Sequence, residues 1–192
     1  MQKYDLEQFI VDCRQTIDRC QSPSKCVEGI VPLMHRLLND DTSFLKEEHR
    51  ATAEGHYARN AVHIEEGTLG IYVLVWKPGQ WTPIHDHGTW GVVGVIEGTL
   101  QETSFIRTDD LGKGAKENLK LVFGNTMLLN PGTVTSFVPN PDHIHKTGNA
   151  DSSNQTVISL HLYGRDMAGY HEYDIDKGVR VWKEVGHKNC QN

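Results

Sequence analysis

From about residue 56 onward, the chain consists of short apolar runs separated by turns that contain glycine or proline. Ile71–Trp76 is the clearest run, and Glu97-Gly98 separates the next two. Residues 119–141 predict three further short strands, with the first break at Gly124-Asn125. Many short strands at roughly 8–12-residue intervals are typical of a β-sandwich or a β-barrel.

Residues 1–50 have a different period, with apolar side chains three and four positions apart. This spacing predicts amphipathic helices. The second helix should begin at Ser22-Pro23, because serine is a good N-cap and proline suits the first helical position. A short third helix should run through His49. We therefore predict one domain, residues 1–192, with N-terminal helices in 1–50 packed against a β-barrel that covers about 56–183.

Charge and cysteine content limit the partners of the chain. The 192 residues include 19 Lys and Arg against 25 Asp and Glu, a formal net charge of −6, whereas nucleic-acid binding usually needs a basic face. No apolar run approaches the ~20 residues of a membrane span, and the charged N-terminal segment is unlike a signal peptide. We expect a cytoplasmic protein that binds neither nucleic acid nor membrane. Its cysteines should be reduced, with Cys13 and Cys20 as packing residues.

His85-Asp86-His87 is the sharpest local indication of chemistry. On a strand, residues i and i+2 face the same side, so both imidazoles would point into the barrel, close enough to share a metal ion. A third ligand must come from another segment. Alternation does not choose between His143 and His145, which are two positions apart, and His161 is a further histidine within a predicted strand.

Four elements, in order along the chain, carry a family resemblance. Gly79-x5-His85-x-His87-x3-Gly91-x6-Gly98 resembles the first cupin motif, and His145-x3-Asn149 resembles the end of the second. Ser159-x-His161-x-Tyr163 is similar to the Ser-His-Tyr triad of the cysteine dioxygenase family. Tyr57-Ala58-Arg59-Asn60 is similar to the segment in which those enzymes carry a carboxylate-binding arginine. The resemblance covers roughly residues 50–165 and implies a mainly β, cupin-type (jelly-roll) barrel.

The resemblance implies a non-heme iron thiol dioxygenase that uses O2 to oxidise a small carboxylated thiol to a sulfinate, with L-cysteine as the favoured substrate. Imidazole ligands suit Fe(2+), and the planar fork of Arg59 matches a carboxylate. Residues 159, 161 and 163 alternate, so all three would face one side of a strand. The implied site comprises the metal ligands His85, His87 and His145, the substrate-binding residues Arg59 and Tyr57, and the catalytic residues Ser159, His161 and Tyr163.

Two departures from the family pattern affect this site. Gly91 stands where most cupins place a glutamate ligand and where mammalian cysteine dioxygenases have a nearby cysteine that crosslinks to the triad tyrosine. No crosslink to Tyr163 is therefore expected, a pattern that resembles bacterial members. Asp142 replaces the usual glycine three residues before His145, which leaves His143 open as the third ligand.

Other functions stay open at this point. The substrate could be 3-mercaptopropionate or mercaptosuccinate. The mercaptopropionate branch tends to carry glutamine in place of Arg59, together with an arginine after the triad. Arg165 follows the triad here, but it does not align with that second arginine. A non-catalytic cupin binding module would not need Arg59 and the 159–163 row together. A cupin isomerase or hydrolase with another divalent metal would usually keep the glutamate at position 91.

Overall fold

Helices precede strands, as the change in apolar period predicts. The computed structural model describes residues 3–40, 42–139, 142–150, 152 and 154–185. Its helices are α1 (Leu6–Arg19), α2 (Pro23–Asp40) and the 3-10 helix η1 (Glu47–Arg50), and none is long and apolar enough to cross a membrane. Its strands are β1 (Ala58–Glu65), β2 (Leu69–Trp76), β3 (Gly91–Glu97), β4 (Leu100–Arg107), β5 (Leu121–Leu129), β6 (Val134–Phe137), β7 (Ile144–Gly148), β8 (Val157–Tyr163), β9 (Gly169–Asp174) and β10 (Val179–Glu184).

Cysteines link the two long helices, contrary to the expectation of reduced thiols. Cys20 forms a disulfide with Cys26. Cys20 is the C-cap of α1 and Cys26 lies in the first turn of α2, so the short connection brings their Cα atoms to 5.2 Å, within the usual range for a disulfide. Cys13 is a free thiol buried in the core, as predicted for a packing residue. Cys190 lies outside the described residues.

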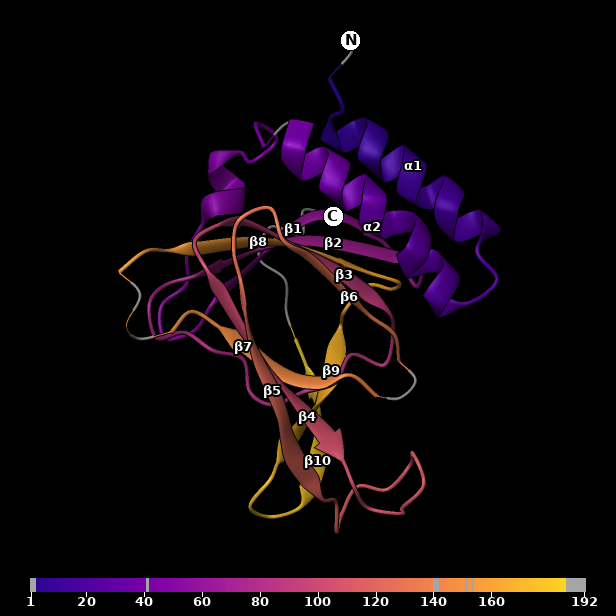
Figure 1. Cartoon of the computed structure of the whole chain (residues 1–192), viewed down its shortest axis with the longest axis vertical. Coiled ribbons are helices and arrows are strands. Elements are labelled where there is room, and N and C mark those ends of the chain that lie inside the picture. Colours follow the sequence, from indigo (N-terminus) through magenta and orange to yellow (C-terminus); the bar gives the residue numbers. More distant parts are fainter. Residues whose placement is uncertain (1–2, 41, 140–141, 151, 153, 186–192) are drawn as a thin grey trace.

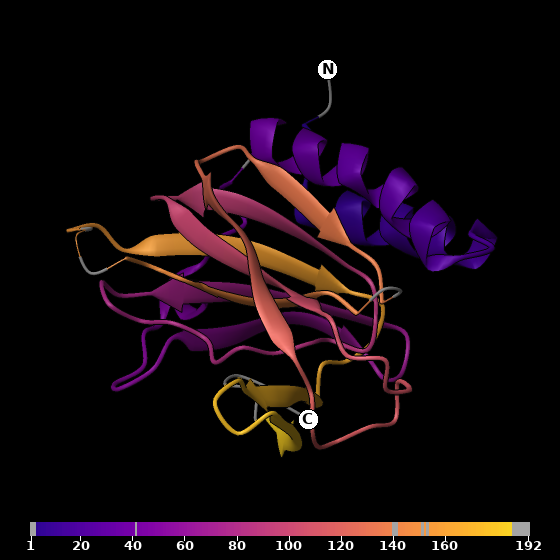
Figure 2. The ribbon, with the colours of Figure 1, turned by 60° about the horizontal axis from the view of Figure 1, so that its bottom comes forward.

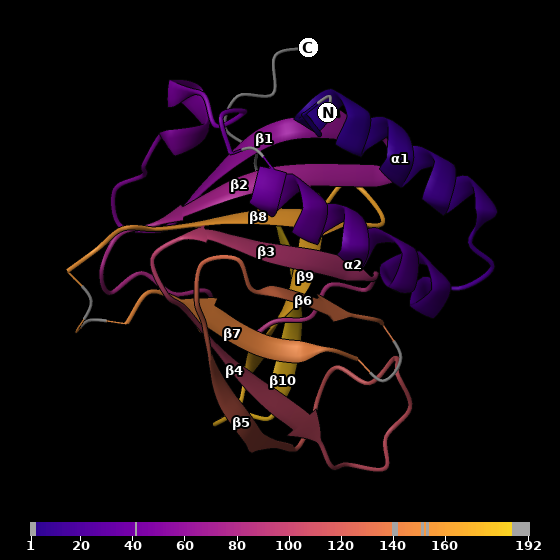
Figure 3. The same ribbon diagram turned by 45° about the horizontal axis from the view of Figure 1, so that its top comes forward.

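A five-stranded antiparallel sheet, in the order β1-β2-β8-β3-β6, carries α1 and α2 across one face (Figure 3). Odd-numbered residues of β2, from Ile71 to Val75, pack with Met34 of α2. Even-numbered residues, from Tyr72 to Trp76, pack with Leu100 of β4 between the sheets. Strand β2 is therefore buried along its whole length, which explains its unbroken apolar run.

The opposite layer consists of a three-stranded sheet, β5-β4-β7, and the separate hairpin β9–β10 (Figures 1 and 2). The cupin-type fold is as predicted, but the sheets do not close into a continuous barrel. The reason lies in residues 81–90, which contain isolated bridges and no regular strand. Their bridges reach β7 at His145 and Gly148, and β9 at Glu172.

The prediction of a strand break at Gly124-Asn125 is wrong, because β5 continues through both residues. The pairing of β4 with β5 instead shifts register between Thr103 and Phe105. Ser104 sits at this irregularity, where its Oγ accepts a hydrogen bond from Asn125 N at 3.1 Å. A β-bulge therefore accommodates the two turn-forming residues without ending the strand.

Candidate metal centre

His85 and His87 lie in the bridged segment between β2 and β3, and not on a regular strand as predicted. Main-chain hydrogen bonds nevertheless keep His85 extended: His85 N donates to His145 O at 2.8 Å, and His145 N donates to His85 O at 3.0 Å. Two residues paired in this way across an antiparallel bridge present their side chains to the same face. The bridge therefore explains why residues 60 positions apart converge.

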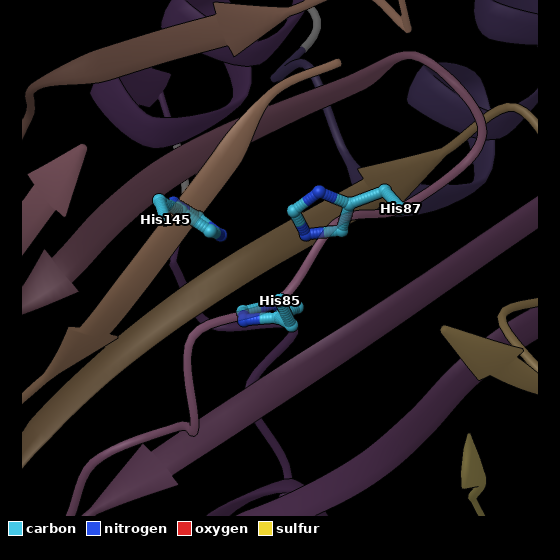
Figure 4. Close-up of side chains that lie close together, drawn as sticks. All are labelled: His85, His87 and His145. Carbon is cyan, nitrogen blue, oxygen red and sulfur yellow. The ribbon is translucent and has the colours of Figure 1, made fainter. Parts of the chain in front are cut away.

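The rings of His85, His87 and His145 converge from two segments (Figure 4). Their centroids are 4.7–4.9 Å apart, and one ring nitrogen from each falls in a group whose members all lie within 4.8 Å. All three side chains are buried. The structure thus brings together the three predicted ligands, with His145 in this group and His143 outside it.

The three histidines fit a metal ion by their electrostatics as well as their geometry. Burial lowers the pKa of His85 and His87 well below the usual value, and it lowers that of His145 too. Neutral imidazole is the form that binds metals. Nδ1 of His87 and both ring nitrogens of His145 are buried without a formed hydrogen bond among the described residues. Buried polar atoms normally have partners, and a cation between these rings would be a partner for the free ring nitrogens.

Glu102 on β4 is a site residue that the sequence analysis missed. Its Oε1 lies 3.3 Å from Nε2 of His143 and 3.5 Å from Nδ1 of His145. Burial alone would raise the pKa of Glu102, but the contacts with the two histidines outweigh it and hold the pKa well below its usual range. The signal in the sequence is a glutamate two positions after Leu100, on the inward-facing side of its strand.

Ser159, His161 and Tyr163 form a hydrogen-bonded row on β8, as their alternation predicts. The Ser159 Oγ lies 2.8 Å from Nε2 of His161, whose Nδ1 lies 3.0 Å from the Tyr163 hydroxyl. Trp76 Nε1 extends the row by donating to Ser159 Oγ at 3.0 Å. Burial lowers the pKa of His161 to about 3 and raises that of Tyr163 above its usual value. The row is therefore uncharged.

A pocket beside the histidines is lined by Arg59, Tyr57, Tyr163 and Tyr170. The Arg59 guanidinium lies over the Tyr72 ring, 4.6 Å from its centroid, and both terminal nitrogens are 3.3 Å from Met167 O. Tyr57 stacks on Trp76 with centroids 4.4 Å apart. The guanidinium thus faces the same pocket as the histidines, with only a neutral carbonyl at its fork among the described residues.

A side chain at position 91 would require the Phe137 ring to move. A Cβ added to Gly91 would lie 2.4 Å from Cζ of Phe137. The Phe137 ring itself stacks on His87 with centroids 4.3 Å apart. Gly91 on β3 pairs with Tyr163 on β8 in the sheet. The residue that replaces the crosslinking cysteine is therefore a direct neighbour of the triad tyrosine.

Asp86 faces away from the pocket and fixes residues 85–87, here called the metal segment, to the β9–β10 hairpin. Tyr173 Oη donates to Asp86 Oδ2 at 2.9 Å, and Arg180 Nη1 lies 3.6 Å from the same oxygen. The Nδ1 of His171 is 3.2 Å from it. Arg165, two residues after Tyr163, donates through Nη2 to His87 O at 2.9 Å and to Gly169 O at the start of the hairpin at 3.0 Å.

A buried three-histidine group between two jelly-roll layers defines a metal-binding cupin. The chain belongs to the cysteine dioxygenase type I family, whose model matches residues 26–176. Cysteine dioxygenase type 1 of Homo sapiens is 24% identical over 164 residues, which cover 85% of this chain and 73% of that protein. The Danio rerio enzyme of the same name is 24% identical over 176 residues, with 88% and 83% covered.

Among solved structures, a Klebsiella pneumoniae protein with a double-stranded β-helix domain matches at a TM-score of 0.49 and 18% identity, covering 70% of this chain and 99% of that one. Family membership makes the chain a metal-dependent thiol dioxygenase, which acts on a small thiol and O2.

Proposed function

We propose that this chain oxidises L-cysteine to cysteine sulfinate with O2, using Fe(2+) held by His85, His87 and His145. The observation that carries the proposal is a single pocket in which three neutral histidines, Arg59 and Tyr163 meet. The ferrous ion would bring thiol and O2 together and supply the redox chemistry that transfers both oxygen atoms to sulfur. Three imidazoles without a carboxylate leave the ion its full charge, which favours the thiolate form of the substrate.

Arg59 holds the substrate carboxylate in this proposal. Its fork is a planar pair of donors that can bind both carboxylate oxygens at once. The Met167 carbonyl, at 3.3 Å from both nitrogens, is a long and neutral partner that a carboxylate would surpass. Tyr57 lines the same pocket and places a second hydroxyl-bearing ring beside Arg59.

The row on β8 gives the Tyr163 hydroxyl a direction. Because Trp76 donates to Ser159 Oγ, the serine proton is available to Nε2 of His161. His161 then carries its own proton on Nδ1 and donates it to the Tyr163 oxygen at 3.0 Å. With the bonds in this order, the Tyr163 oxygen accepts from His161, and its hydroxyl hydrogen is free to donate to a group in the pocket. We infer that Tyr163 donates a hydrogen bond to the reacting thiol or to the oxygen added to it.

Charges outside the pocket favour cysteine over a dicarboxylate. A hollow that shares Tyr57, Arg59 and Tyr170 with the pocket is also lined by Glu172 and Glu184. Glu172 follows Tyr170 by two positions on β9, so both face the same side. Carboxylates there attract an ammonium group and repel a second carboxylate. Cysteine carries the ammonium, 3-mercaptopropionate lacks it, and mercaptosuccinate adds a carboxylate.

Metal analysis followed by oxygen uptake on a panel of thiols tests the proposal. The purified chain should hold iron at up to one equivalent, and the highest kcat/KM should be for L-cysteine, followed by 3-mercaptopropionate and then mercaptosuccinate. Glu172→Gln should narrow the gap between cysteine and mercaptosuccinate. A higher kcat/KM for either competitor would reject cysteine as the substrate, and no uptake with any thiol would reject the activity.

A further inference from the structure

Glu102 is a carboxylate in a buried, inward-facing position of the sheet. It faces inward on β4, two residues after the buried Leu100, and its side chain is 6% exposed. An ionised carboxylate in such a place is costly unless it is paired. No lysine or arginine pairs with it in the described part of the chain; its partners are two histidines.

The geometry separates the two nitrogens of His145. Nδ1 faces Glu102 Oε1 at 3.5 Å, slightly beyond a formed hydrogen bond. The ring as a whole lies within 5 Å of the His85 and His87 rings, centroid to centroid. His85 has the same arrangement, since its Nδ1 lies 3.0 Å from Pro83 O. In both residues, Nδ1 has an oxygen beside it and Nε2 remains for the metal group.

We propose that Glu102 is a positioning residue: its carboxylate accepts a hydrogen bond from Nδ1–H of His145 and so directs Nε2 of that ring to the metal. The inference rests on the proposed ligand set of His85, His87 and His145. A carboxylate behind a metal-bound histidine fixes the tautomer and the ring orientation and makes the ring a stronger ligand. His143 Nε2 lies 3.3 Å from the same carboxylate, outside the group of the three proposed ligands.

A competing arrangement uses the same residues. Glu102, His143 and His145 also offer ligand atoms within 4.8 Å of one another, and two histidines with one carboxylate can bind iron. The positioning role is favoured because the His85–His87–His145 group is buried throughout, whereas the His143 side chain is 24% exposed.

Anaerobic Fe(2+) titration against a competing chelator tests the role without measuring activity. Glu102→Leu keeps the bulk and removes the acceptor, so the Kd for Fe(2+) should rise about 10–100-fold, the usual cost of losing such a partner. Glu102→Gln keeps a carbonyl oxygen in reach of Nδ1 and should recover most of the affinity. His143→Gln is the matched control, and it should leave both Kd and the single iron equivalent unchanged.

Thermal unfolding of the metal-free proteins separates positioning from folding. The Leu and Gln variants should have similar Tm values without iron and differ once iron is added. If Glu102→Leu does not fold, Glu102→Asp replaces it, because aspartate keeps the charge and loses the reach; its Kd should exceed that of Glu102→Gln.

Two results would overturn the role of Glu102: an unchanged Kd in the Leu or Asp variant, or a second iron equivalent in wild type that His143→Gln removes. A different result would reject the proposed function: iron-loaded wild type that does not oxidise any thiol.

Discussion

Arg59 is the residue on which recognition of a carboxylate depends in our proposal. Arg59→Ala should leave iron content near wild type, because the guanidinium is not a metal ligand, and it should lower kcat/KM for cysteine. Loss of a paired charge in a partly buried site costs about 2–5 kcal/mol, so the ratio should fall roughly 30-fold or more. Arg59→Lys should recover only part of the loss, because lysine keeps the charge without the fork. Oxygen uptake measures all three proteins.

Cysteamine is the control substrate for Arg59, because it has the thiol and amine of cysteine but no carboxylate. Any turnover of cysteamine should change far less in Arg59→Ala than turnover of cysteine. An equal loss for both thiols would mean that Arg59, which contacts Met167 O and Tyr72, supports the fold and not the substrate.

The third metal ligand is tested by a pair of matched variants. His145→Ala should abolish stoichiometric iron, because its ring completes the buried group with His85 and His87. His143→Ala, two residues earlier, should retain iron, because its ring lies outside that group. Metal analysis after anaerobic loading decides between them. Full iron in His145→Ala, together with loss in His143→Ala, would exchange their roles.

Gly91 is expected to be intolerant of even one methyl group. The Cβ of Gly91→Ala would meet the Phe137 ring, which is held by its stacking on His87, and overpacking of this kind costs about 1–3 kcal/mol. Gly112→Ala is the control, since nothing lies within 4 Å of its added Cβ. Urea unfolding should show a lower free energy of unfolding for the first variant alone. Equal stability of both variants would mean that Phe137 moves aside freely.

The same glycine removes the partner for a Cys–Tyr crosslink. The intact mass of the reduced protein should equal the mass of the unmodified chain. A deficit of two hydrogens that maps to Tyr163 after reduction would contradict this.

Among the larger elements, the β9–β10 hairpin supports the metal segment from outside the pocket. Tyr173→Phe removes the hydroxyl that donates to Asp86 and accepts from Arg180 at 3.2 Å. Because these groups are buried, the free energy of unfolding should fall by about 1–3 kcal/mol. Lys177→Ala, which loses only an exposed ion pair with Asp174 at the hairpin turn, should change it little. Urea unfolding of both variants measures the difference, and equal stability would show that the hairpin contact is dispensable.

Local patterns along the chain predicted those features that one element decides alone. Apolar period placed the two long helices and the strands β2, β3, β4, β6 and β8, and alternation placed Ser159, His161 and Tyr163 on one face of β8. The motif spacing singled out His85, His87 and His145. These features depend on side-chain direction within a segment, which the order of residues determines.

Features that depend on pairing between distant segments were missed or mispredicted. The burial of Glu102 follows from the pairing of β4 with β7, which places Thr147 opposite it. The role of Asp86 depends on the hairpin more than 80 positions later. The continuity of β5 through Gly124 required the bulge at Ser104, and the Cys20–Cys26 bond required the helices to meet. None of these partners is specified by local period.

In the molecule as a whole, the two helices and the second layer leave the five-stranded sheet covered on both faces (Figure 3). The inner face of that sheet can therefore hold an uncharged polar row, on β8, beside neutral histidines. Burial keeps both groups uncharged. Arg59 then provides positive charge in the pocket next to the metal site, while Glu172 and Glu184 line the adjoining hollow.

The fate of the oxygen atoms tests the central claim most directly. Iron-loaded protein should be given L-cysteine and 18O2, and the product mass and oxygen consumption measured together. We expect one O2 consumed per cysteine and a sulfinate that carries both labelled atoms, with neither seen for His145→Ala. Cystine or hydrogen peroxide as the product, or a sulfinate without two labelled atoms, would contradict a thiol dioxygenase that works through this histidine group.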